Sequence, residues 1–117
     1  MSSSAEIYGI AVNVPASHLE ILMDAIDSVM EPLYPGYRRS FCYWPVKGTW
    51  KTMEGANPYN GKVGEITVTD EMRLKFVCRK EDVEKVLRKI GEVHPYEEPA
   101  VDVTPQIAWR EFTAPSL

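Results

Sequence analysis

The alternation of apolar and polar residues predicts four strands. Residues 7–14 alternate between a larger apolar face and a small, partly apolar face, which indicates a strand in the centre of a sheet. A second, aromatic-rich strand is expected at residues 37–46, and Pro45 places its far end at an edge or a bulge. A long third strand is expected at residues 62–78. A fourth is expected at residues 100–107, with Pro105 at an edge.

Two further segments have the spacing of amphipathic helices. Residues 16–30 carry one apolar stripe, and Ser17 lies three residues before Glu20, which is the spacing of a capping box. Residues 81–93 carry a second stripe, and Glu84 and Arg88 form a favourable i,i+4 pair. The stripes consist of Leu19, Leu22, Met23, Ile26, Val29 and Met30 in the first helix, and of Val83, Val86, Leu87, Ile90 and Val93 in the second.

The order β-α-β-β-α-β predicts an α+β, ferredoxin-like fold, in which two helices cover one face of an antiparallel four-stranded sheet. The extended hairpin formed by the second and third strands is expected to protrude from this sheet. We expect residues 1–5 to form a flexible N-terminus, residues 6–107 to form the domain, and residues 108–117 to form a polar tail without periodicity.

Composition narrows the classes of partner. The 117 residues are 44% hydrophobic and 26% charged with a net charge of −4, and the one dense basic cluster is Arg38-Arg39, so a nucleic-acid partner is not expected. No apolar run approaches the roughly 18 residues of a membrane span, and the first residues do not resemble a signal peptide. Cys42 and Cys78 lack metal-site spacing and are expected to be free thiols. We expect a cytoplasmic protein.

The segment from His94 to Asp102 concentrates the candidate chemistry. Two prolines, Pro95 and Pro99, fix the backbone and make this segment a rigid corner. His94, Tyr96, Glu97 and Glu98 lie in it. Three interpretations are open: a structural corner in which His94 caps helix carbonyls and a glutamate accepts backbone N–H groups, a ligand-binding site, or a metal site completed by Asp102 or by a second subunit.

A second candidate segment is the turn-rich loop at residues 54–61, which holds Asn57 and Tyr59. It is either a plain connection or a binding surface. His18, in the first turn of the first helix, is expected to be a solvated surface residue. A nucleophile–base pair of Ser40 or Cys42 with His94 is left open, although no local pattern supports it. The chain has no phosphate-binding glycine loop.

These motifs resemble a known family. The run His94-Pro95-Tyr96-Glu97-Glu98-Pro99-Ala100, followed by Asp102, is similar to the HPYEEPAYD signature of the PII/CutA-like insert domain of YqfO-type proteins, a dinuclear-metal, GTP-cyclohydrolase-like family. Gly55-Ala56-Asn57-Pro58-Tyr59, with Gly61 and Val63-Gly64, resembles the GANPFIGEVG segment of that family. Val14-Pro15 and His18-Leu19-Glu20 resemble its first strand-to-helix corner. The match covers roughly residues 6–107.

The resemblance implies a ferredoxin-like domain with a long hairpin, and PII and CutA relatives assemble as trimers. Three positions depart from the family pattern: Ser40 stands where a cysteine is expected, Arg38 where an acid is expected, and Val101 where a tyrosine is frequent. The metal centre of the full-length family lies in flanking domains rich in histidine and carboxylates. This chain has only His18 and His94 and lacks those domains, so the resemblance does not extend to a di-metal hydrolase.

Taken together, the residues and the resemblance predict a non-catalytic, small-ligand-binding or regulatory module that forms a homo-oligomer, with a trimer favoured. Its ligand is expected in inter-subunit clefts, in contact with Asn57, Tyr59, His94, Tyr96, Glu97 and Glu98. The alternative is a divalent-metal-binding, CutA-like protein, and a hydrolase is a third hypothesis. No cofactor is identified by the sequence.

Overall fold

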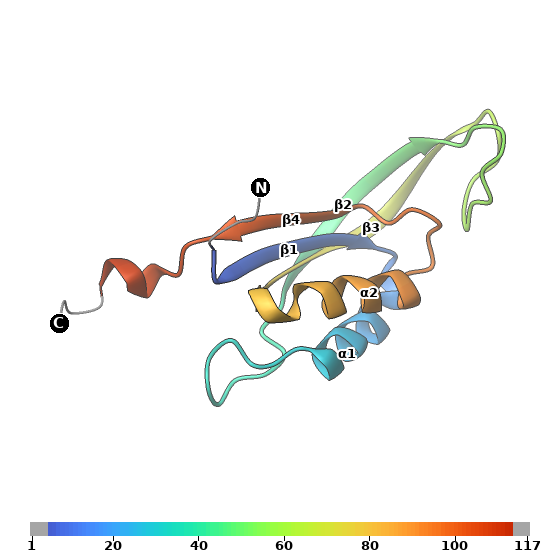
Figure 1. Cartoon of the computed structure of the whole chain (residues 1–117). Helices are drawn as coiled ribbons and strands as arrows, with labels where there is room; N and C mark the ends of the chain where they lie inside the picture. The colour runs from blue at the N-terminus through green and yellow to red at the C-terminus, as the bar shows by residue number, and fades with distance from the viewer. Residues whose placement is uncertain (1–4, 114–117) are drawn as a thin grey trace.

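The structure is a computed structural model that describes residues 5–113. Its regular elements alternate in the predicted order (Figure 1). They are β1 (Ile7–Val14), the 3-10 turn η1 (Ala16–His18), α1 (Leu19–Val29), β2 (Cys42–Lys51), β3 (Ile66–Arg79), the 3-10 turn η2 (Lys80–Asp82), α2 (Val83–Val93), β4 (Val101–Gln106) and the 3-10 turn η3 (Trp109–Phe112).

The strands form one antiparallel sheet in the order β2-β3-β1-β4. Both α-helices lie against the same face of this sheet, and the opposite face is left uncovered by helix (Figure 1). The predicted α+β, ferredoxin-like architecture is therefore confirmed. The central position of β1 and the edge positions of Pro45 in β2 and Pro105 in β4 are also as predicted.

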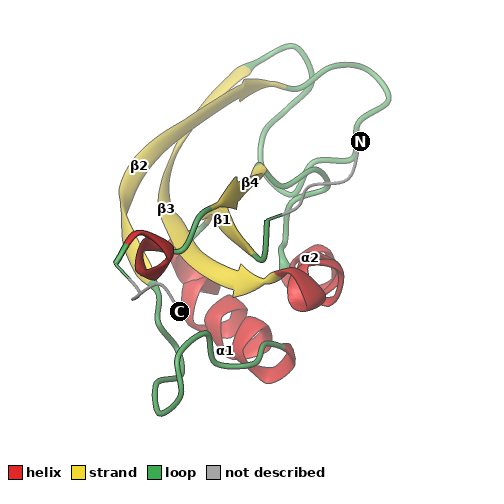
Figure 2. Ribbon diagram, turned by 60° about the vertical axis from the view of Figure 1, so that its left-hand side comes forward, coloured by secondary structure: helices red, strands yellow, loops and turns green. Residues whose placement is uncertain are grey.

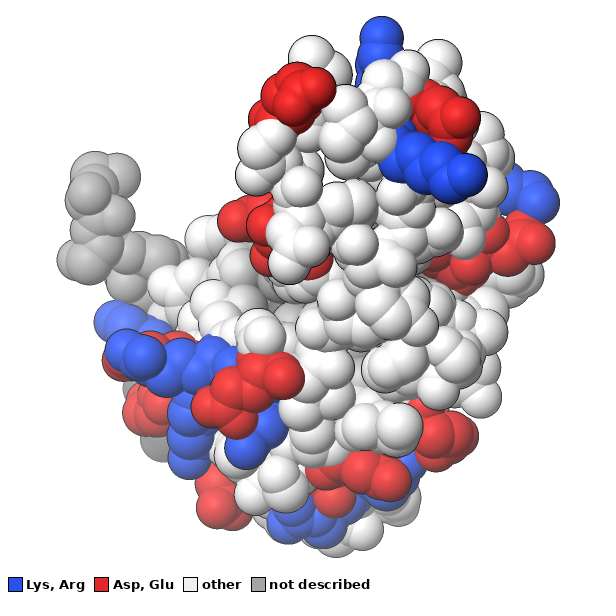
Figure 3. Space-filling model, turned by 90° about the vertical axis from the view of Figure 1, so that its right-hand side faces the viewer, with Lys and Arg blue, Asp and Glu red and all other residues white. Residues whose placement is uncertain are grey.

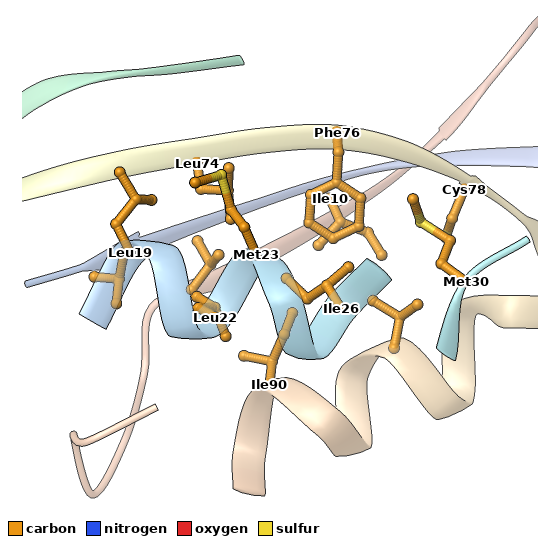
Figure 4. Close-up of a cluster of buried hydrophobic side chains, with 13 residues drawn as sticks. Ile10, Leu19, Leu22, Met23, Ile26, Met30, Leu74, Phe76, Cys78 and Ile90 are labelled. Carbon is orange, nitrogen blue, oxygen red and sulfur yellow. The ribbon is translucent and has the colours of Figure 1, made fainter. Parts of the chain in front are cut away.

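The hydrophobic core lies between the helices and the covered face of β1 and β3 (Figure 4). Alternate residues of each strand point into it, as the period-2 pattern predicts, and one stripe of each helix meets them. Its fully buried members include Ile10, Val12 and Val14 of β1, Leu74 of β3, Leu22 and Ile26 of α1, and Val86 and Ile90 of α2. Burying each such side chain contributes roughly 1.5–3 kcal/mol, so this layer holds the fold together.

The hairpin of β2 and β3 continues well beyond the helices and curves over the sheet (Figure 1 and Figure 2). The two strands stay paired from Cys42 opposite Lys75 to Lys51 opposite Ile66. The helices cover only the part of β3 from Met72 onward, because Leu74, Phe76 and Cys78 belong to the core whereas Ile66 and Val68 are exposed. The hairpin at one end and the segment after β4 at the other make the molecule elongated, with extents of 61 × 31 × 23 Å (Figure 1).

Three local predictions were wrong. The second strand begins at Cys42 rather than at Tyr37, because positive φ angles at Gly36 and Arg39 turn the chain before it. It also runs on regularly to Lys51. The third strand begins at Ile66 rather than at Lys62, after a further positive φ at Gly64.

The predicted capping box does not form. The Ser17 hydroxyl lies 2.9 Å from His18 Nδ1, and no side-chain hydrogen bond caps α1. The reason is local: residues 16–18 make a 3-10 turn, so the helix starts later than the Ser17–Glu20 spacing requires.

Both arginines of the basic pair Arg38-Arg39 contact groups of the first helix. Arg38 donates to the carbonyl of Asp27 at the C-terminal end of α1, and Arg39 pairs with Asp24. Arginine at this end of a helix satisfies carbonyls that lack an intrahelical partner, which gives Arg38 a structural place where the family pattern has an acid.

At the C-terminus, residues 109–112 form a 3-10 turn where no regular element was predicted, and Trp109 and Phe112 are exposed there. The predicted flexible N-terminus lies outside the described residues apart from Ala5. Within residues 5–113, no helix is long and apolar enough to cross a membrane.

Candidate functional site

The two motif-like segments of the sequence meet in the structure. The backbone N–H of Asn57, in the hairpin loop, donates to Glu97 Oε1 of the proline-bounded corner at 3.1 Å. The rings of Tyr59 and Tyr96 lie with their centroids 5.9 Å apart. The loop is therefore packed against the corner, and one of the two glutamates accepts a backbone N–H, as the structural interpretation of the corner predicts.

His94 lies beneath this contact and is only 6% exposed. Its Nε2 is 2.6 Å from the carbonyl oxygen of Asn13, and its Nδ1 accepts the backbone N–H of Tyr96 at 3.1 Å. Since a carbonyl can only accept, Nε2 carries the proton. Burial lowers the pKa of His94 below its ordinary 6.5, so the ring is neutral. His94 thus joins the corner to the end of β1. Its partner is the carbonyl of Asn13 in this strand, whereas the sequence predicted carbonyls of a helix.

Tyr96 joins the corner to the hairpin. Its hydroxyl donates to Glu71 Oε2 of β3 at 2.7 Å, and Glu71 is itself 4% exposed. Burial, followed by the hydrogen bond and charge of Glu71, raises the pKa of Tyr96, so the phenol stays protonated and remains a donor. The opposite strand makes room for this carboxylate with Gly48, where an added Cβ would lie 2.1 Å from Glu71 Oε1.

Two further aromatic rings pack against Tyr96 in this link. Trp50 of β2 packs edge-on against Tyr96 with centroids 5.4 Å apart, and Tyr59 lies against Tyr96 from the loop. His18 in turn meets Tyr59 at 6.0 Å, so it contacts the site from its outer side instead of being only a solvated surface residue. The β2–β3 register puts Gly48, Trp50 and Glu71 on the sheet face that the helices leave uncovered.

A pocket of about 610 Å³ lies between the hairpin, its loop and the corner, and its lining includes Gly48, Trp50, Tyr59, Glu71 and Tyr96. Figure 3 looks onto this end of the molecule and shows acidic atoms within the hollow beside the projecting hairpin. Of the predicted ligand contacts, Tyr59, Tyr96, Glu97 and Glu98 line the pocket. Asn57 and His94 do not line it; they hold the loop and the corner in place through the bonds described above.

Comparison with known proteins identifies relatives of this chain. No protein-family model matches the chain. A GTP cyclohydrolase 1 type 2 homolog of Halalkalibacterium halodurans is 30% identical over 106 residues, which are 89% of this chain and 28% of that protein. The corresponding protein of Mycobacterium leprae is 33% identical over 94 residues, covering 79% of this chain and 24% of its own length. The chain is a homologue of one segment of this family.

Solved structures give the fold of that segment. A Bacillus cereus protein related to NIF3 superposes with a TM-score of 0.76 and 24% identity over 92% of this chain and 27% of its own. The divalent cation tolerance protein CutA of Archaeoglobus fulgidus gives 0.64 and 16% over 91% and 90%. The GlnK protein of B. subtilis gives 0.58 and 14% over 87% and 86%. The predicted PII/CutA-like fold is confirmed, and the chain spans about 28% of the length of the first relative.

The structure also bears on two other hypotheses for this PII/CutA-like domain, a metal site and a nucleophile–base pair of Ser40 or Cys42 with His94. Among residues 5–113, no group of three or more histidine, cysteine, aspartate or glutamate side chains is arranged to hold a metal ion. Ser40 and Cys42 line a separate pocket, of about 420 Å³, between α1 and the start of β2. The ring nitrogens of His94 are engaged by Asn13 and Tyr96, so the pair with Ser40 or Cys42 does not form.

Sequence reasoning missed Trp50, Glu71 and Gly48. Trp50 and Gly48 lie beyond the end that the sequence predicts for the second strand, and Glu71 lies in the predicted third strand with no role assigned to it. A signal for Glu71 was present: it shares the parity of Arg73 and Lys75, which predicts the face away from the helices. The burial of that carboxylate under Tyr96 depends on the curl of the hairpin, which the pattern does not contain.

Proposed function

We propose that this domain is a non-catalytic binding module whose site is the pocket between the hairpin, its loop and the His94–Ala100 corner. The observation that carries the proposal is the convergence of the two motifs: the Asn57–Glu97 and Tyr96–Glu71 hydrogen bonds join segments far apart in the chain around one pocket. Concave, aromatic-lined sites with a few placed polar groups are the usual form of small-molecule sites.

Within this proposal the residues have two kinds of role. Tyr59, Tyr96, Glu97 and Glu98 contact the ligand, together with Trp50. Asn57 and His94 are positioning residues, because their own hydrogen bonds are made inside the protein. A rigid corner suits this work, since a preorganised site loses little entropy when the ligand binds.

The proposal includes self-assembly, with three copies favoured by the resemblance to PII and CutA. β2 and β4 are the edge strands among the described residues, and the free edge of a strand can pair with another copy of the chain. Exposed apolar side chains gather on the hairpin and after β4, at Ile66, Val68 and Ile107. A cytoplasmic location without a nucleic-acid or membrane partner remains part of this proposal.

A thermal-shift screen of small molecules tests the binding role. Ligands of the pocket should raise the midpoint of wild type and of Tyr37→Ala, but not of Tyr59→Ala. Both tyrosines are exposed, at 71% and 56%, and only Tyr59 lines the pocket, so the pair is matched. A screen in which no compound distinguishes Tyr59→Ala from the control would remove the proposal.

Two further measurements test the proposed self-assembly and the alternative function, divalent-metal binding. Sizing in solution should give about 40 kDa for three copies of the 13.3 kDa chain, and a monomer would remove the assembled form. Zinc is included among the compounds, because the alternative function is divalent-metal binding. A zinc-specific shift that Glu97→Gln and Glu98→Gln abolish would replace the small molecule by a metal ion.

A further inference from the structure

We propose that the occupant of the pocket is an organic cation, an alkylammonium or guanidinium group carried on an apolar body. This inference rests on the proposed binding function and deepens it by naming the ligand class. It comes from two features that the sequence motifs do not contain: the balance of charge around the pocket and the arrangement of its aromatic rings.

The charge balance favours a positive ligand. Three carboxylates line the pocket, those of Glu71, Glu97 and Glu98. Among the described residues none of the three has a basic side chain within ion-pair distance, although eight other ion pairs occur there. Two lysines also lie on the lining: Lys47, which is paired with Asp70, and Lys51. The lining therefore holds three carboxylates against two lysines, and this excess of negative charge favours a cation over an anion such as a phosphate.

The hydrogen bonds of these carboxylates preserve their charge. Tyr96 donates to Glu71, and the Asn57 N–H donates to Glu97; both donors are neutral, so each bond fixes a carboxylate without cancelling it. Glu98 is exposed at the edge of the pocket. The pocket therefore has two fixed negative groups and one that is free to turn toward a ligand.

The rings supply the second attraction. Tyr96 lies between Trp50 and Tyr59, with centroid distances of 5.4 and 5.9 Å and interplanar angles of 62° and 45°. All three rings line the pocket. The face of an aromatic ring is electronegative and attracts a cation within about 6 Å, and aromatic rings also bury the alkyl groups of such a ligand. A bare metal ion would gain little from ring faces, so an organic cation fits the lining better.

Isothermal titration of the purified protein, in whatever assembly it adopts, tests the inference. The probes are choline, tetraethylammonium and agmatine as cations, 3,3-dimethyl-1-butanol as the neutral isostere of choline, and adenosine monophosphate as an anion. We expect at least one cation to bind, with the neutral isostere about tenfold or more weaker when choline is that cation. Adenosine monophosphate should not bind.

Substitutions of lining residues test whether the cation binds in this pocket. Trp50→Leu and Glu98→Gln should each weaken the cation by about fivefold or more, since one removes a ring face and the other a charge. Tyr37→Leu and Glu81→Gln, exposed changes outside the pocket, should leave its affinity unchanged.

The outcomes separate the two proposals. If the neutral isostere binds as well as choline, or if neutral or anionic compounds bind the pocket while no cation does, the cation inference fails and the binding function stands. If no probe binds and the thermal-shift screen shows no compound that depends on Tyr59, both fail.

Discussion

The two halves of the β2–β3 hairpin are held in different ways. Near the helices, β3 contributes Leu74, Phe76 and Cys78 to an apolar core, where the burial of alternate side chains stabilises the structure. Beyond Met72 the same strands have no helix behind them, and the hairpin is joined to the body through Tyr96–Glu71, Asn57–Glu97 and ring contacts. One pair of strands thus contributes to the apolar core at one end and lines the proposed binding site at the other.

The two kinds of contact also respond differently to change. An apolar core tolerates imprecise geometry, because its free energy follows the area buried. Buried hydrogen bonds do not, because a lost partner leaves a desolvated group unpaired. Substitutions in the two halves should therefore differ in both size and character, and the following predictions run from the largest effect to the smallest.

Truncation in the core half should be the most costly. Leu22 of α1 is fully buried, so Leu22→Ala should lower the free energy of unfolding by about 3 kcal/mol through lost burial and a residual cavity. Ile21→Ala, next to it and 56% exposed, should cost less than about 0.5 kcal/mol. Chemical denaturation at one protein concentration measures both. Equal losses for the two variants would mean that α1 does not pack as described.

A methyl group added at Gly48 tests the distal half. Because its Cβ would fall 2.1 Å from Glu71 Oε1, Gly48→Ala should displace that carboxylate from Tyr96 and cost about 1–3 kcal/mol. In a Glu71→Ala background the same methyl group has nothing to displace, so its cost there should be close to zero. A double-mutant cycle measured by denaturation gives the coupling. Additive losses would show that Glu71 does not occupy the space over Gly48.

Acid should weaken the corner through His94. Burial lowers its pKa in the folded chain, whereas the unfolded chain titrates near the ordinary 6.5. Below 6.5 the unfolded chain therefore binds more protons, and the free energy of unfolding should fall as the pH falls toward the folded-state pKa. His94→Gln keeps an N–H donor for the Asn13 carbonyl and removes the titration, so it should flatten this part of the profile. A profile that stays as steep in the variant would assign the pH dependence to other groups.

The smallest effect concerns Thr52, at the base of the hairpin loop. Its hydroxyl is buried and, among the described residues, has no hydrogen-bond partner. Thr52→Val replaces it by a methyl group of similar shape and should leave stability unchanged or raise it by up to about 1 kcal/mol. Thr104→Val, at an exposed position of β4, is the matched control and should change little. A clear loss at Thr52 alone would reveal a partner for this hydroxyl.

The same contrast explains what the sequence could predict. The core half follows from local periodicity: the stripe from Leu19 to Met30 and the parity from Met72 to Cys78 each identify a buried face. Pro45 likewise predicts an edge strand. Where two local preferences compete, as at Ser17, the spacing rule failed because a 3-10 turn replaced the first turn of the helix.

The site half depends on pairings that no local pattern contains. Tyr96 meets Glu71 across 25 positions, and His94 meets Asn13 across 81. The motifs singled out the loop and the corner that meet in the structure, but the burial of His94 and the place of Trp50 in the pocket follow from strand register and from the curl of the hairpin. Position in the fold, rather than residue type, decided which of the candidate residues line the pocket.

Hydrogen exchange at the Asn57 amide tests most directly whether the loop and the corner form one site. The account predicts slow exchange in the wild-type protein, because this N–H donates to Glu97, and much faster exchange in Glu97→Ala, with Glu98→Ala as the neighbouring control that leaves it slow. Fast exchange of Asn57 in the wild-type protein, or equal rates in wild type and Glu97→Ala, would contradict it.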